Sequence, residues 1–336
     1  MDFIFSYILF FVKLITIVAL FCFLISLLFS INIRKSKNSY LKVVNLNKIY
    51  SEYQRKIYSI KMNYTEYKKW FKKYKQNLKK RVGKNRLFCK SKISKKNSLF
   101  VINFKGSINA QEVHALREEI TAILSVANKK DEVLLRLESP GGVVHGYGLA
   151  AAQLSRLKEK NIRLTISIDK IAASGGYMMA CVADYIIAAP FAIIGSIGVV
   201  AQIPNIHNLL KKNNIDIEQH TTGEYKRTLT VLGENTEEGR KKFIEELYET
   251  HNLFKDFVHK NRKSLDIQSV SNGKHWYGIE SKKNGLVDEL KLSDDFILEK
   301  INTHDIIEII FSPSKCFIEN FINIIFDKIK NSFLHQ

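Results

Sequence analysis

Between residues 99 and 180, apolar segments typical of buried strands alternate with turns and helical patterns. The apolar segments are LFVINF (99–104), EVLLRLE (132–138) and IRLTISI (162–168). After the first, Asn109 is the expected N-cap of a helix that places Val113, Leu116, Ile120 and Leu124 on one face. The second ends in a Ser-Pro-Gly-Gly turn before a helix over 148–160. This alternation predicts an α/β domain of stacked β and α units.

The segment after residue 185 is less regular. IIAAPFAIIGSIGVVAQIP (186–204) is apolar enough for a membrane span, but its proline and glycines favour short buried strands and turns. We expect a helix over 207–214 and a strand over 215–220. After a loop, Asn235 and Glu238 resemble a capping box that begins a long amphipathic helix.

Residues 1–32 predict a transmembrane anchor. Lys13 is the only charge between Phe3 and Ile31, and the apolar run from Leu14 to Ile31 is about long enough to cross a hydrocarbon core of roughly 30 Å. No small-residue cleavage site follows it, which favours an uncleaved anchor over a signal peptide.

Three further regions are expected after the anchor. Residues 33–98 are rich in Lys and Tyr and predict a partly helical, basic spacer near anionic lipid heads. Residues 99–300 form the main domain, and residues 301–336 form a tail with an amphipathic helix. Phe317, Phe321, Ile324, Ile325 and Phe333 lie on or near one face of that helix, which suits a partner subunit, the membrane surface or the chain's own domain.

The formal charge of +19 and the pI near 9.6 are compatible with an anionic partner. We expect no nucleic-acid partner, because no recognition motif accompanies the charge. Cys22, Cys89, Cys181 and Cys316 have no metal-ligand spacing, and buried thiols are the simpler interpretation.

Ser174 is the strongest candidate for chemistry. It follows a strand within Ala-Ala-Ser-Gly-Gly, where a hydroxyl and the amides of a helix start lie together. Gly141 and Gly142 form a second turn that we expect at the same end of the sheet. The alternatives are an ordinary helix-capping serine and an ordinary Pro-Gly-Gly turn.

A serine nucleophile needs a base. His145, His207 or His220 with Asp169 or Asp184 would make a triad. Lys226, in the loop before the long helix, would make a dyad if apolar surroundings lower the pKa of its amine. The residues alone leave both open.

Three blocks carry a resemblance to a known family. LRLESPGGVVHGYGLAAAQL, DKIAASGGYMMACVADYIIAAPFAIIGSIGVVAQ and YKRTLTVLGENTEEGRKKF are similar to the corresponding blocks of short, membrane-anchored members of the signal peptide peptidase A family. The similarity runs from about Val101 to Leu290. It implies that Ser174 is the nucleophile, that Lys226 is the general base, and that Gly142, with Gly141 second, forms an oxyanion hole with the Gly175 amide.

The same resemblance implies a ClpP/crotonase-like superhelix of stacked ββα units. The implied function is a serine endopeptidase with a Ser-Lys dyad, which cleaves extended apolar peptides such as signal-peptide remnants or misfolded segments of membrane and exported proteins. Its expected partners are peptide or protein substrates, the lipid bilayer and further copies of the chain. No metal or organic cofactor is expected.

Two other classes remain open, an acyl-CoA enzyme of the crotonase type and a non-catalytic membrane scaffold. The expected location is the bacterial inner membrane. The family places the catalytic domain in the periplasm, whereas Arg34, Lys35, Lys37 and Lys42 favour the cytoplasmic face.

Overall fold

The computed structural model describes residues 9–21, 40–83, 96–223 and 225–312. The chain divides into two compact units, one of Met1–Lys42 with Ile310–Gln336 and one of Val43–Ile309. In the first unit, residues 9–21 form a helix with exposed apolar side chains. Across the described ranges, no helix combines the length and apolarity that a membrane crossing requires. The rest of the predicted anchor, and the predicted helix around Phe317, lie outside the described residues.

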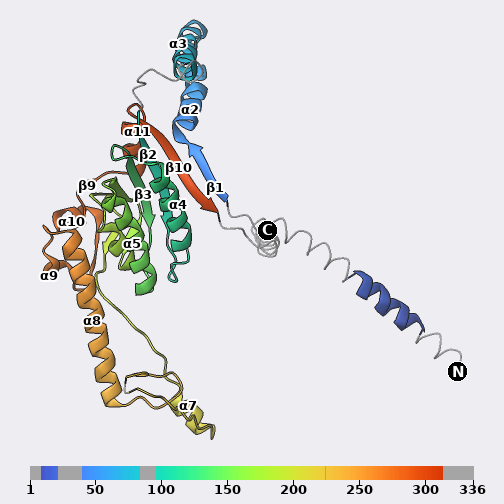
Figure 1. The fold of residues 1–336 in the computed structure, drawn as a ribbon, viewed down its shortest axis with the longest axis vertical. Coiled ribbons are helices and arrows are strands. Elements are labelled where there is room, and N and C mark those ends of the chain that lie inside the picture. Colours follow the sequence, from blue (N-terminus) through green and yellow to red (C-terminus); the bar gives the residue numbers. More distant parts are fainter. Residues whose placement is uncertain (1–8, 22–39, 84–95, 224, 313–336) are drawn as a thin grey trace. The chain divides into compact units, whose positions relative to one another are not determined.

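A seven-stranded sheet forms the centre of the larger unit (Figure 1). Its order is β1-β10-β2-β3-β4-β6-β9, and every pair from β10 to β9 is parallel. The strands are β1 (Tyr40–Asn45), β10 (His304–Ser312), β2 (Asn97–Lys105), β3 (Glu132–Glu138), β4 (Arg163–Ile168), β6 (Tyr185–Ala188) and β9 (Glu289–Leu290). The expected α/β architecture is therefore confirmed, and its main sheet is largely parallel.

A smaller sheet lies at the end of β3. It contains β5 (Ile171–Ala173), β7 (Ile193–Gly195) and β8 (His275–Tyr277), with β5 and β7 parallel and β7 and β8 antiparallel. A single bridge between Ser139 and Ala172 connects the end of β3 to β5. This bridge brings the two glycine-rich turns of the sequence together.

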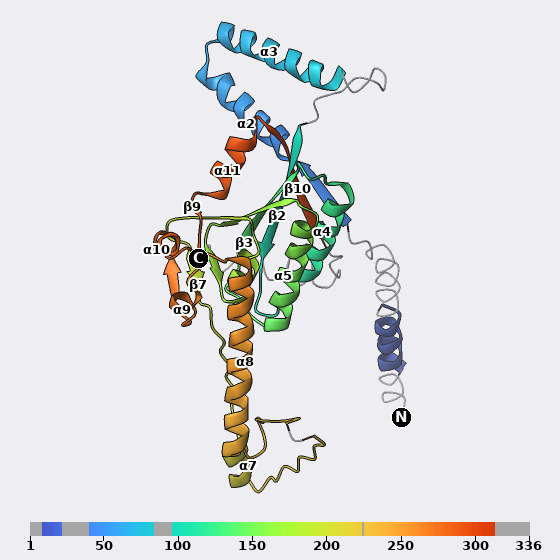
Figure 2. The same cartoon turned by 60° about the vertical axis from the view of Figure 1, so that its left-hand side comes forward.

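Helices connect and cover these strands. They are α2 (Leu46–Lys61), α3 (Tyr64–Gly83), α4 (Val113–Val126), α5 (Val144–Glu159), α6 (Gly175–Ala180), α7 (His207–Lys212), α8 (Glu237–Asn261), α9 (Ile267–Val270), α10 (Gly278–Lys283) and α11 (Ser293–Lys300). Figures 1 and 2 show α4 and α5 side by side next to β2 and β3. Val113, Leu116 and Ile120 of α4 are buried in the core as predicted, and Leu124 packs against it half-buried.

Several local predictions were wrong. The helix after β2 begins at Val113 rather than at Asn109, because Ala110 has a left-handed φ of 52° that a helix does not accommodate. Residues 215–220 form no strand. The cap of α8 is Thr236, whose hydroxyl accepts from the Gly239 amide, while Asn235 accepts from the Thr230 amide instead.

The sheet extends beyond the expected range of 99–300 on both sides. Residues 304–308 of β10 pair with 97–101 of β2, so part of the expected tail lies inside the sheet, between β1 and β2. Leu46, from the expected spacer, is buried in a cluster with Leu99 and Ile306. In the described part of the expected spacer, residues 40–83, the strand β1 is followed by the helices α2 and α3.

The side chain of Asn47 connects α2 to the β10 region by three hydrogen bonds, and its removal should destabilise the fold. Its Nδ2 donates to the carbonyls of Ile301 (3.0 Å) and His304 (3.1 Å), and its Oδ1 accepts from the Ile306 amide (2.6 Å). Asn47→Ala should lower the free energy of unfolding by about 2 kcal/mol, because partly buried groups lose their partners. Asn213→Ala is the control in urea unfolding, because it removes one exposed hydrogen bond, from the residue after α7 to the Leu209 carbonyl. Equal stability of the two variants would contradict this role.

Candidate active site

Ser174 has a strained backbone at the junction of β5 and α6. Its φ of 52° and ψ of −119° are rare for a residue with a side chain. Its amide donates to the Gly195 carbonyl (2.8 Å), and its carbonyl accepts from the Met178 amide (3.0 Å). The side chain is half-buried and makes no capping hydrogen bond to α6. The interpretation of Ser174 as an ordinary capping serine is therefore wrong.

The two glycines after Ser174 allow α6 to approach two neighbours closely. A Cβ on Gly175 would lie 2.5 Å from Cγ of Tyr147, and one on Gly176 would lie 2.6 Å from the Ser139 carbonyl oxygen. Both contacts are shorter than side chains tolerate. The Ser-Gly-Gly sequence thus places the serine against the turn that follows β3.

That turn lies directly beside Ser174. Gly141 has a φ of +89°, and a Cβ on it would lie 2.8 Å from both the Ser174 Cβ and the Gly175 nitrogen. A Cβ on Gly142 would lie 2.0 Å from the Ile108 carbonyl oxygen. The structure therefore brings Gly141, Ser174 and Gly175 together, with Gly142 next to them in the chain.

The backbone amides in this region differ in their partners. The Gly141 amide donates to Oγ of Ser139 at 3.1 Å. Within the described part of the chain, no hydrogen bond uses the amide of Gly142 or that of Gly175, which begins the first turn of α6. Two unpaired amides near a half-buried hydroxyl form an arrangement that suits an oxyanion.

Lys226 is not brought to Ser174 within one chain. It is exposed, and its amide donates to the Gly223 carbonyl at 3.2 Å, inside the loop between α7 and α8. Of α8, only Phe254 and Val258 are buried, and both lie in its C-terminal half. In Figures 1 and 2, α7 lies near the other end of α8, away from the sheet.

The histidine alternative has no support in the contacts. Asp169 accepts from the amide and hydroxyl of Ser293, and Asp184 accepts from the Leu164 amide, so both carboxylates hold the fold. The His220 ring contacts Glu218 at 3.4 Å. No hydrogen bond among the described residues links His145, His207 or His220 to Ser174.

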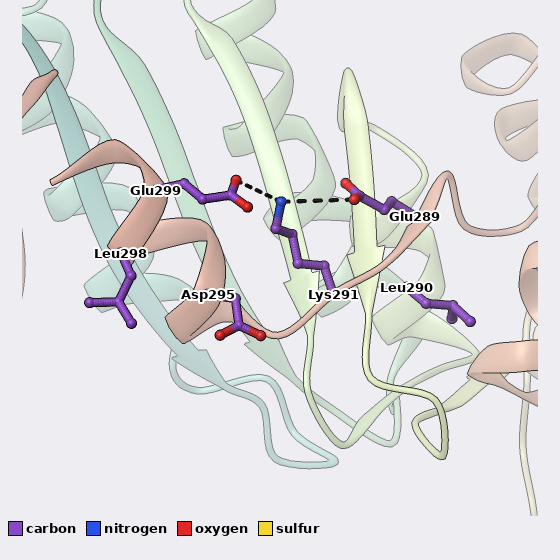
Figure 3. A pocket seen from close by; sticks show the side chains of 6 residues that line it. All are labelled: Glu289, Leu290, Lys291, Asp295, Leu298 and Glu299. Carbon is purple, nitrogen blue, oxygen red and sulfur yellow. Dashed lines mark hydrogen bonds and ion pairs between the residues drawn. The ribbon is translucent and has the colours of Figure 1, made fainter. Parts of the chain in front are cut away.

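Two other reactive groups can be set aside as the nucleophile or the base. Cys181 is buried, as predicted, and burial raises the pKa of its thiol to about 12. Lys291 lies in a surface pocket formed by Glu289, Leu290, Lys291, Asp295, Leu298 and Glu299 (Figure 3). Its amine contacts Glu299 at 2.6 Å and Glu289 at 3.8 Å, and the hydrogen bond to Glu299 raises its pKa. This lysine stays charged, and the pocket contains none of the predicted site residues.

Two residues at the site were missed by the sequence reasoning. Ser139 and Tyr147 are fully buried, and their hydroxyls lie 2.6 Å apart. Tyr147 shares its spacing with Ala150, Ala151 and Leu154, all buried on the same face of α5. That spacing indicates a core tyrosine, so nothing in the pattern separates this one from an ordinary core residue.

The fold and the site define an α/β protein with a candidate nucleophilic serine beside unpaired backbone amides. Two family models match the chain, "Peptidase family S49 N-terminal" over residues 2–154 and "Peptidase family S49" over residues 156–306. The chain belongs to peptidase family S49, the family of signal peptide peptidase A, and is a protease. The resemblance found in the three sequence blocks is confirmed.

Two relatives of similar sequence agree with this assignment. The chain is 55% identical to "Probable protease SohB" of Buchnera aphidicola subsp. Schlechtendalia chinensis, over 89% of this chain and 100% of the relative. It is 60% identical to "Probable protease SohB" of Haemophilus influenzae, over 68% of this chain and 64% of the relative. A solved structure of a mutant of the 1510-N membrane-bound stomatin-specific protease matches with a TM-score of 0.39 and 16% identity, over 61% of this chain and 84% of that one.

Proposed function

We propose that this protease is a membrane-anchored serine endopeptidase that uses Ser174 and Lys226 as a dyad. The observation that carries the proposal is the strained Ser174, whose hydroxyl is not used for capping and lies beside the unpaired amide of Gly175. Strained backbone at a half-buried nucleophile is typical of active sites, because the surrounding structure holds the side chain in the reactive position.

The reaction follows from these roles. The hydroxyl of Ser174 attacks the peptide carbonyl, and the neutral amine of Lys226 accepts its proton and returns it to the leaving amine. Water then attacks the acyl-enzyme by the same route. The amides of Gly142 and Gly175 bind the oxyanion of each tetrahedral intermediate.

The position of Lys226 supports a site completed by a second copy of the chain. An exposed lysine must be desolvated to act as a base, and the loop that carries it extends from the exposed end of α8. A neighbouring protomer that binds this loop would exclude water from Lys226 and would contribute the serine. We therefore propose a closed homo-oligomer as the active form.

Exposed apolar side chains beside the candidate oxyanion hole support an apolar peptide substrate. Ile108 is 68% exposed and Val144 is 47% exposed. The Val143 amide donates to the Ile108 carbonyl at 3.0 Å, which keeps both side chains next to Gly142. An extended apolar segment of a signal-peptide remnant or a misfolded membrane protein suits such a surface.

Three further parts of the proposal concern architecture and location. The exposed apolar side chains of the helix over residues 9–21 support a membrane anchor. The periplasmic location of the catalytic domain is proposed from the family resemblance alone. The stacked parallel units and the small second sheet support a ClpP/crotonase-like superhelix.

A fluorophosphonate probe tests the proposed nucleophile. The full chain in detergent should be labelled at Ser174 alone, because only this serine has an activating base and an oxyanion hole. Peptide mapping by mass spectrometry identifies the labelled residue, and labelling and peptide cleavage should both rise toward alkaline pH as the base loses its proton. Labelling at another serine, or efficient cleavage by a chain that the probe never modifies, would contradict the assignment.

A further inference from the structure

A buried chain of hydroxyl groups runs behind the candidate oxyanion hole. The Gly141 amide donates to Oγ of Ser139 (3.1 Å), this oxygen lies 2.6 Å from the Tyr147 hydroxyl, and the Tyr147 hydroxyl donates to the Ser107 carbonyl (2.8 Å). Ser139 and Tyr147 are completely buried. The chain thus connects the loop after β2, the helix α5 and the turn after β3.

The direction of every hydrogen bond in this chain is fixed by the number of protons. Tyr147 has one hydroxyl proton, and the Ser107 carbonyl can only accept, so that proton points to Ser107. The Tyr147 oxygen must therefore accept the proton of Ser139. The Ser139 oxygen in turn accepts from the Gly141 amide. Burial raises the pKa of Tyr147, which keeps its proton in place.

One-way chains of this kind strengthen each member, because each donor is polarised by the bond it accepts. The far end is also held, since the amide and hydroxyl of Ser107 both donate to Oε2 of Glu112, at 3.1 and 2.9 Å. At the near end, the chain fixes the peptide nitrogen of Gly141, the residue whose α-carbon packs against Ser174 and Gly175.

We propose that Tyr147 and Ser139 are positioning residues that hold the Gly141 amide out of the reaction and so set Gly142 as the oxyanion donor of the turn. This rests on the proposed function of Ser174. It gives different roles to two neighbouring glycines that the family resemblance only ranks as first and second: the Gly141 amide is structural, and the Gly142 amide meets the substrate.

The ring of Tyr147 has a separate packing role, so the test must remove only its hydroxyl. Tyr147→Phe keeps the ring that touches Gly175, and Ser139→Ala removes the acceptor of the Gly141 amide. Tyr185→Phe is the control, because it also removes a tyrosine hydroxyl, one that bonds to Glu289 at 3.0 Å from strand β6.

We expect kcat for an apolar fluorogenic peptide to fall roughly tenfold in each variant with KM nearly unchanged, which is less than the loss of an oxyanion donor itself. The double variant should be no slower than either single one, because both break the same chain. Tyr185→Phe should retain full kcat. The thermal unfolding midpoint of each full-length variant shows whether it is folded.

Several outcomes would overturn the proposal. These are full kcat in folded Tyr147→Phe or Ser139→Ala, a raised KM with unchanged kcat, and losses that multiply in the double variant. If Tyr147→Phe does not fold, the test rests on Ser139→Ala, for which the proposal requires a lowered kcat with KM nearly unchanged. If the Ser174→Ala variant remains active, the proposed function itself is refuted. Failure of the positioning role and failure of the proposed function are therefore distinguishable.

Discussion

Replacing Ser174 with alanine should lower peptide cleavage at least about a thousandfold and leave the chain folded. The substitution removes one oxygen that makes no capping bond, while the backbone bonds to Gly195 and Met178 remain. Cleavage of a fluorogenic peptide and the thermal unfolding midpoint are the two measurements. Ser155→Ala is the matched control, because Ser155 is half-buried on α5 and its hydroxyl donates to the Ala151 carbonyl of its own helix.

The strained backbone at Ser174 should lower the stability of the protein, although the serine is required for activity. Ser174→Gly should be inactive as well, but more stable than Ser174→Ala by about 1 kcal/mol, because glycine adopts a φ of 52° without strain. Retention of a tenth of the original activity by either variant would count decisively against the nucleophile. Equal stability of the two variants would show that the strain inferred from the backbone is not stored there.

The parallel sheet could be predicted from the sequence because its strands have a simple signature. β2, β3 and β4 each contain a run of consecutive buried residues, so their apolar segments stand out from the lysine-rich remainder. The predictions failed where a single backbone angle sets the start of a helix, or where a strand pairs with a segment distant in the sequence. The left-handed φ of Ala110 delays α4, and the pairing of β10 with β2 joins segments some 200 positions apart.

The candidate site was predicted only in part for a similar reason. Short motifs mark Ser174, Gly141 and Gly142, since close approach of the backbone requires glycine at particular positions. The roles of Ser139 and Tyr147 depend on distances across three segments, which periodicity cannot show. Motif spacing likewise gives Lys226 a position in the chain but does not give its position relative to Ser174.

Lys226→Ala should be as damaging as Ser174→Ala, although the side chain is exposed and its loss should leave stability nearly unchanged. Lys241→Ala, on the exposed side of α8, is the matched control and should keep full activity. His207→Ala and His220→Ala should also be mild. An active Lys226→Ala variant together with an inactive histidine variant would replace the dyad with a triad.

Mixing two inactive variants tests whether the dyad is shared between copies of the chain. α8 has 25 residues, and its first buried residue, Phe254, lies about 26 Å along the helix from Glu237, so the Lys226 loop is well placed to reach a neighbour. In co-assembled Ser174→Ala and Lys226→Ala chains, a shared site receives an intact serine from one and an intact lysine from the other. Random 1:1 assembly into a closed ring should then restore about a quarter of the activity of the unmodified protein. If the lysine and the serine of each site come from the same chain, no mixed assembly contains an intact site, and the mixture should stay as inactive as its components.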